Sequence, residues 1–77
     1  MDRDLINRCI KEAISEGTTR GYFRYKYILS KILNLNQNPS LLKNELEIMV
    51  REGLLTKPND FDPEGYIVTE QWLHLFG

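Results

Sequence analysis

Apolar residues in the middle of the chain recur with the period of an α-helix. They stand four and three residues apart, at Leu42, Leu46 and Met49. This spacing places them on one face of a helix, and Gly53 follows at the kind of position where glycine commonly ends one. Asn38 can cap the start, and Pro39 suits the first helical position. The pattern predicts a helix over 39–52.

Two earlier segments also have helical spacing. The first carries apolar residues at Leu5, Ile6, Cys9, Ile10, Ala13 and Ile14. It predicts a helix over 3–16 that is capped by Asp2 or Asp4 and ends at Gly17. The second predicts a helix over 26–33, with Leu29, Ile32 and Leu33 facing inward and Lys26 and Lys31 facing outward.

The segments between these helices are less regular. Residues 17–25 allow either a turn and a short strand or an early start to the second helix. Residues 34–39 form a polar connector in which we expect the apolar Leu35 to insert into the core.

The last third of the chain has the pattern of a hairpin followed by a helix. Residues 54–57 can form a strand that pairs with 66–68, while Pro58 and Pro63 keep the segment between them out of a regular ladder. Thr69 can cap a short final helix. That helix carries Trp72, Leu73, Leu75 and Phe76.

Seventy-seven residues predict one domain, 1–77, with a core small enough that a dimer or a partner would add useful burial. No apolar stretch approaches the roughly 18 residues that cross a bilayer. The first residues lack the pattern of a signal peptide, and the single Cys9 cannot form an internal disulfide. We therefore expect a cytoplasmic protein in which Cys9 is a buried, inert thiol.

The net charge of −1 conceals two blocks of opposite sign. Residues 17–44 carry five bases and no acid, whereas 45–77 carry two bases and seven acids. Such segregation indicates either a polarised surface or an ordinary solvated surface that is unevenly sampled.

The helix 26–33, the connector and the helix ending in Gly53-Leu54-Leu55 together resemble the winged helix-turn-helix superfamily. In many of its regulators the turn reads Leu-Gly-Leu-Ser, and here Leu33-Asn34-Leu35-Asn36 stands at that place. The segment 66–70 resembles the strand that leads into the family's last helix. The likeness covers about 26–72. The connector is longer than the family's turn, and Asn34 replaces glycine, although asparagine tolerates a left-handed backbone.

The resemblance implies a mainly α domain with a small β-hairpin: a winged helix with a three-helix core, a two- or three-stranded wing and a short C-terminal helix. It also implies a small DNA-binding protein, a transcriptional regulator of a bacterium or mobile element. Such a protein would read double-stranded DNA with the helix 39–52, as a homodimer on a two-fold site.

If that helix enters a major groove, its outward residues should face the bases. These residues are Ser40, Lys43, Asn44, Glu47 and Arg51. Lys43 can donate to guanine, Asn44 can bond adenine, and Glu47 can accept from cytosine. Arg51 could reach the backbone. The alternative is that all five form only the solvated face of an amphipathic helix.

Bases and aromatic residues alternate just before this region. The run comprises Arg20, Tyr22, Arg24, Tyr25, Lys26 and Tyr27. With Lys31, its bases are candidates for phosphate contacts, and we expect Tyr25 to be partly buried. The alternative is that the tyrosines belong to the core and the bases are solvated.

The predicted wing is acidic, with Asp60, Asp62 and Glu64. Because phosphate repels such a tip, it favours a second function: a winged helix that binds a protein, as an adaptor or inhibitor, through this wing or an exposed apolar patch. The same loop partly matches a calcium loop, but Gln71 stands where the bidentate carboxylate belongs, so we expect no metal.

The sequence contains no spaced nucleophile and base. It has one histidine, His74, which we expect at the surface, and one cysteine. We therefore expect neither catalysis nor a cofactor.

Overall fold

The computed structural model describes residues 2–17, 21–58 and 63–77. Within these ranges the elements follow the order α1 (Arg3–Glu16), β1 (Tyr22–Arg24), α2 (Tyr25–Asn34), α3 (Leu42–Arg51), β2 (Leu55–Thr56), β3 (Gly65–Val68) and α4 (Glu70–Phe76). The described part of the chain is thus mainly α-helical, with four helices and one three-stranded antiparallel sheet.

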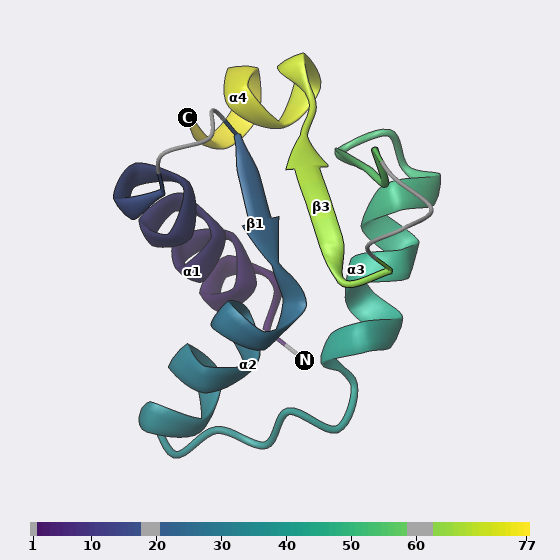
Figure 1. The fold of residues 1–77 in the computed structure, drawn as a ribbon. Helices are drawn as coiled ribbons and strands as arrows, with labels where there is room; N and C mark the ends of the chain where they lie inside the picture. Colours follow the sequence, from purple (N-terminus) through teal and green to yellow (C-terminus); the bar gives the residue numbers. More distant parts are fainter. Residues whose placement is uncertain (1, 18–20, 59–62) are drawn as a thin grey trace.

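The sheet has α1 and α2 beside β1, and α3 on the side of β3 (Figure 1). Its strand order is β1-β3-β2, so that the last strand in sequence is the central one. Phe23 faces Tyr66 across one pair of strands, and Leu55 faces Val68 across the other. These four side chains are buried, and they share one face because side chains alternate along a strand. This face of the sheet packs against the buried side chains of the helices.

The core draws on every helix. Its buried apolar side chains include Ile6 and Ile10 of α1, Ile28 and Ile32 of α2, Leu42, Leu46 and Met49 of α3, and Trp72 of α4. A polar contact crosses it, because the Trp72 indole donates to Asn7 Oδ1 at 3.0 Å. Cys9 is also buried, and burial raises the pKa of its thiol. Within the described residues, no helix combines the length and hydropathy of a membrane-crossing segment.

Several predicted boundaries are confirmed. Helix α1 has the predicted bounds, and the Asp2 side chain accepts a hydrogen bond from the Asp4 amide at 3.0 Å. The short strand β1 forms, rather than an earlier start to α2. Strands β2 and β3 pair as predicted, and the Thr69 hydroxyl caps α4 by accepting from the Trp72 amide.

The predicted start of the third helix at residue 39 is wrong, because α3 begins at Leu42. The Asn38 side chain accepts from the Ser40 amide at 3.0 Å, and the Leu42 amide donates to the Pro39 carbonyl at 2.9 Å. These bonds close a separate turn. Leu41 then departs from helical dihedrals, with φ −104° and ψ 5°, so that the ladder of α3 starts only after it.

The predicted inward set of the second helix is partly wrong. Ile28 and Ile32 are fully buried and Leu29 is half-buried, but Leu33 is 51% exposed. The core stripe of α2 is centred on Ile28 and Ile32, and Leu33 lies about 100° around the helix from Ile32.

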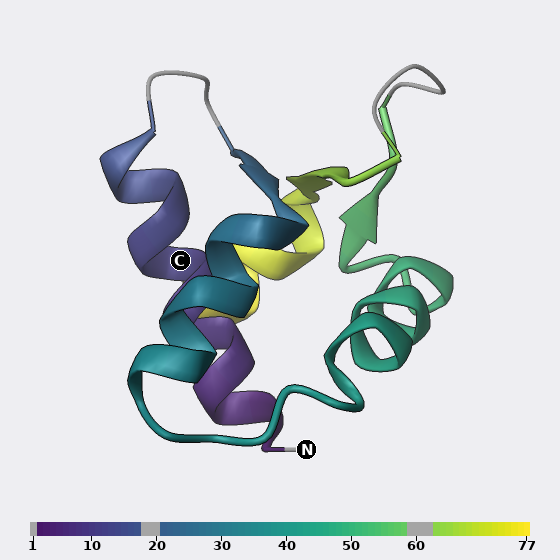
Figure 2. The same ribbon diagram turned by 60° about the horizontal axis from the view of Figure 1, so that its bottom comes forward.

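The connector also differs from the prediction. Leu35 is 52% exposed and does not insert into the core. The connector crosses the surface from α2 to α3 (Figure 2), which explains why its residues stay in contact with solvent. Asn34 ends α2 in helical conformation, and the left-handed residue is Asn36, with φ 58°.

The end of α3 is a tight, hydrogen-bonded turn. Gly53 has φ +81°, its amide donates to the Val50 carbonyl, and the Leu54 amide donates to the Met49 carbonyl. This pair of bonds is a Schellman motif, which reverses the chain directly into β2. An added Cβ at position 53 would meet only the Gln71 side chain, at 3.5 Å, so that the need for glycine comes from the backbone.

We expect Gly53→Ala to lower the free energy of unfolding by about 1–2 kcal/mol, because an L-residue is strained in the left-handed conformation. Gly53→Asn should cost less, since asparagine visits this region more readily. Urea unfolding of the three proteins measures both effects. Equal stability of wild type and Gly53→Ala would contradict the role of this turn.

Candidate nucleic-acid interface

The five outward residues predicted for the third helix are all exposed. Lys43, Asn44, Glu47 and Arg51 lie on α3, and Ser40 lies in the turn before it. They are exposed because Leu42, Leu46 and Met49 bury the opposite face of α3 completely. Residues three and four apart share a helix face, so Lys43, Glu47 and Arg51 form one row.

The start of α2 approaches the start of α3 through Tyr25. The Lys43 ammonium lies 5.3 Å from the centre of the Tyr25 ring, within the range of a cation–π contact. Tyr25 is half-buried, as predicted, and its amide donates to the Glu64 carbonyl at 2.8 Å. This bond joins the start of α2 to the start of β3.

Arg24 and Lys26 flank Tyr25, and both side chains are exposed. The Arg24 guanidinium lies 3.4 Å from the Glu64 carboxylate, which therefore offsets part of its charge. Lys43 thus lies against the ring of Tyr25, whose neighbours in the sequence are Arg24 and Lys26. Arg20 lies outside the described residues.

Lys31 lies elsewhere. Its ammonium is 2.8 Å from Glu12 and 3.9 Å from Glu16, both on α1, and 5.0 Å from the centre of the Tyr27 ring. These acids raise the pKa of Lys31. Five residues of helix rotate Lys31 about 140° away from Lys26. It is thus directed to α1 and does not join the other candidate bases.

Ion pairs with α1 also hold two acids at α3 and its C-terminal end. Arg3 binds Glu45 at 3.2 Å and Glu52 at 2.9 Å, so that these two carboxylates are held on the α1 side of α3. Both pairs are partly exposed, and each adds little to stability. They matter more for the charge of the surface. With Glu45 and Glu52 bound to Arg3, Glu47 is the single acid among the described residues on the outward row of α3.

Two residues that sequence reasoning did not assign to this region lie beside it. Tyr66 is fully buried in the sheet, and its ring stacks on Phe23 with centres 5.5 Å apart. The Lys57 ammonium lies 5.2 Å from the centre of the same ring. The sequence did offer a signal for the burial of Tyr66. Tyr66 and Val68 are two residues apart in β3, so both side chains lie on the inner face of the sheet.

The Tyr66 hydroxyl has no hydrogen-bond partner among the described residues. Burial raises its pKa above the ordinary value, and the Glu47 carboxylate and the Tyr25 hydroxyl raise it further.

The acidic loop and the calcium pattern cannot be placed as a whole, because Asp60 and Asp62 lie outside the described residues. Glu64 and Gly65 are described, and Glu64 is bound to Arg24. Among the residues that the structure describes, no group of three or more metal-ligating side chains is present. His74 is exposed on α4, as predicted.

We expect the free energy of unfolding to fall above about pH 10, because the raised pKa of folded Tyr66 lets the unfolded state ionise first. The contribution is complete below the pKa of the unfolded state and is lost as the pH rises through the folded pKa. Tyr66→Phe should lose less stability over this window. It should be neutral or stabilising at pH 7, because it removes an unpartnered buried hydroxyl.

Urea unfolding at a series of pH values tests this expectation, and Tyr27→Phe, at a half-buried ring, is the matched control. Identical alkaline profiles for wild type and Tyr66→Phe would contradict it.

Comparison with protein family models, with curated proteins and with solved structures yields no match for this chain.

Proposed function

We propose that the chain is a winged helix domain that binds double-stranded DNA through the outward row of α3. The observation that carries the proposal is the contact of Lys43 with the ring of Tyr25, which Arg24 and Lys26 flank in the sequence, beside an exposed helix face that carries Asn44. Lysine and arginine in this arrangement can contact phosphates, while Asn44 and Lys43 can reach base edges.

The topology supports the winged-helix part of this proposal. Helices α1, α2 and α3 surround one core, β2 and β3 form the hairpin that would be the wing, and β1 completes the sheet at the other edge of β3. A short helix, α4, follows. Helices α2 and α3 would then form the helix-turn-helix, with α3 as the recognition helix.

The distribution of acids also supports it. Arg3 holds Glu45 and Glu52 toward α1, and Arg24 neighbours Glu64. The Arg3 pairs thus hold two carboxylates away from the region around Tyr25, whereas Glu64 offsets part of the Arg24 charge there. Glu47 remains on the outward row of α3. There it can accept a hydrogen bond from a cytosine amino group, and its charge repels phosphate.

A gel-shift measurement with a pool of random duplexes tests the function. At about 50 mM salt we expect retained DNA, since even non-specific binding by phosphate contacts is strong at low ionic strength. Affinity should fall as salt is added. Absence of any retained duplex under these conditions would reject the proposal.

Lys43→Ala should weaken duplex binding and lower the slope of log affinity against log salt by about one, the value expected for one lost phosphate contact. Lys31→Ala removes the same charge from the α1 side, so it should leave both quantities close to wild type. The two variants form a matched pair, and thermal melting checks that each is folded. Equal losses for both would indicate a general charge effect instead of a defined interface.

A second function is favoured by a different observation. Leu33, Leu35 and Leu41 are each more than half exposed around the connector between α2 and α3. Exposed apolar side chains that form one contiguous patch are typical of a surface that binds a protein. On this alternative the domain is an adaptor or inhibitor, and it predicts no salt-dependent affinity for DNA.

The homodimer is also a proposal. It would place two copies of α3 in successive major grooves of a two-fold site.

A further inference from the structure

Leu41 is an apolar side chain among polar neighbours at the start of α3. It is 52% exposed, whereas Leu42 beside it is fully buried. Its carbonyl accepts a hydrogen bond from the Glu45 amide at 3.0 Å, so that Leu41 takes the N-cap position of the helix. Ser40 and Lys43, which precede and follow this pair of leucines, are both exposed. The core therefore accounts for Leu42 but not for Leu41.

Leu41 stands one helical turn before the amide that can bond a base. Side chains three positions apart are neighbours on a helix, with Cβ atoms about 5–6 Å apart, so Leu41 adjoins Asn44. Asn44 is exposed, and its amide group can bond the N6 and N7 positions of an adenine. Base pairs follow each other every 3.4 Å or about that distance along a strand of DNA. Both side chains can thus contact the same base pair or two successive ones.

An exposed leucine at this position matches one feature of the major groove. Base edges there present hydrogen-bond donors and acceptors, and the C5 methyl group of thymine is the apolar group among them. Leucine gains by covering that methyl group and has no hydrogen bond to offer at the other base edges. Leu33 and Leu35 do not share this position, because they lie at the end of α2 and directly after it.

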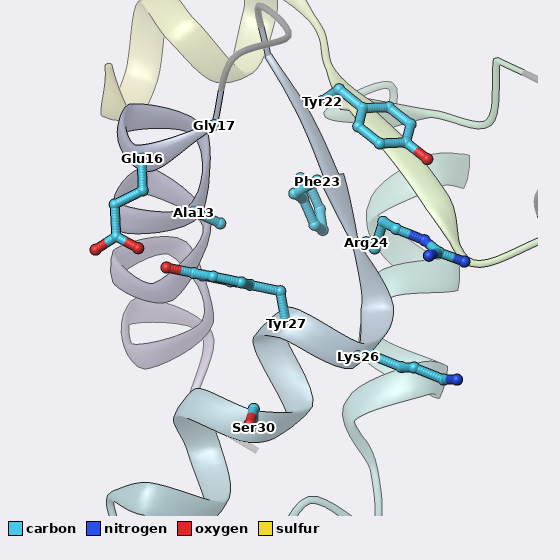
Figure 3. Close-up of a pocket in the computed structure, with 9 residues that line it drawn as sticks. All are labelled: Ala13, Glu16, Gly17, Tyr22, Phe23, Arg24, Lys26, Tyr27 and Ser30. Carbon is cyan, nitrogen blue, oxygen red and sulfur yellow. The ribbon is translucent and has the colours of Figure 1, made fainter.

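The bases at the start of α2 can complement this contact. Arg24 and Lys26 border a cavity of about 550 Å³ between α1, β1 and α2, and the Tyr27 ring belongs to the same lining. The charged ends of Arg24 and Lys26 nevertheless extend away from that ring and from α1 (Figure 3). They are thus directed out of the recess, where Lys26 can contact a phosphate while Leu41 and Asn44 contact base edges.

We propose that Leu41 makes the α3 interface selective for thymine, by packing on its C5 methyl group in the major groove, while Asn44 bonds an adenine of the same or the next base pair. This inference rests on the proposed binding of duplex DNA through α3. It adds the chemistry of the sequence that α3 binds, namely A·T base pairs that present the thymine methyl group.

Two dye-labelled, self-complementary duplexes test the contact: one of alternating adenine and thymine, and one of alternating adenine and uracil. The uracil duplex lacks the C5 methyl groups but keeps every hydrogen-bonding group of the base edges. In fluorescence anisotropy at about 50 mM salt, wild type should bind the thymine duplex about fourfold more tightly, the ratio that corresponds to burial of one methyl group. Leu41→Ala should bind the two duplexes with equal affinity.

Two further variants separate this contact from other effects. Leu33→Ala removes a leucine that is 51% exposed on α2, and it should keep the fourfold preference. Asn44→Ala should weaken binding to both duplexes and also keep the preference, since the amide contacts adenine and not the methyl group. Melting curves check that each variant is folded.

Failure of this contact is distinguishable from failure of the proposed function. Equal affinity of wild type for the two duplexes overturns the thymine contact and leaves the α3 interface in place. A preference that persists in folded Leu41→Ala, or that is lost in Leu33→Ala as well, also overturns the contact. Binding of neither duplex rejects the proposed function, and the thymine contact with it.

Discussion

The arrangement of this domain depends on the central position of β3. At one end of the strand the Glu64 carbonyl accepts from the Tyr25 amide, which sets the start of α2. At the other end the Val68 amide donates to the Gly21 carbonyl, and the Thr69 amide donates to the Leu54 carbonyl. The Thr69 hydroxyl also donates to the Gly53 carbonyl at 2.6 Å. One short strand thereby holds the start of α2 and the end of α3.

This constraint determines which charges meet. The Tyr25 amide is held at the start of β3 and Lys43 lies over the Tyr25 ring, so that the first turn of α3 neighbours the start of α2. On the other side of the molecule, ion pairs with Glu12 and Glu16 direct Lys31 to α1. The basic segment 17–44 is thus divided between two faces. Charge segregation along a chain does not by itself produce one charged surface.

Much of this fold could be predicted from the sequence. Periodicity identified α1, α3 and the outward set on α3, because a helix buries one stripe and exposes the opposite one. Local chemistry identified the cap at Thr69 and the turn at Gly53, because both depend on residues a few positions apart. Errors occurred at Leu33 and Leu35, where an apolar residue gave no sign of whether another element would cover it.

What the sequence alone determined, then, is the place of the four helices and of the β2–β3 hairpin and the buried face of α1 and α3, since these follow from short-range spacing. Only the tertiary structure decided which exposed residues belong together. Lys43 and Tyr25 are far apart in sequence, as are Lys31 and Glu12, and the pairing of each depends on how separate elements pack. The cavity at Tyr27 has the same origin, because its walls come from α1, β1 and α2, and no single segment contains it.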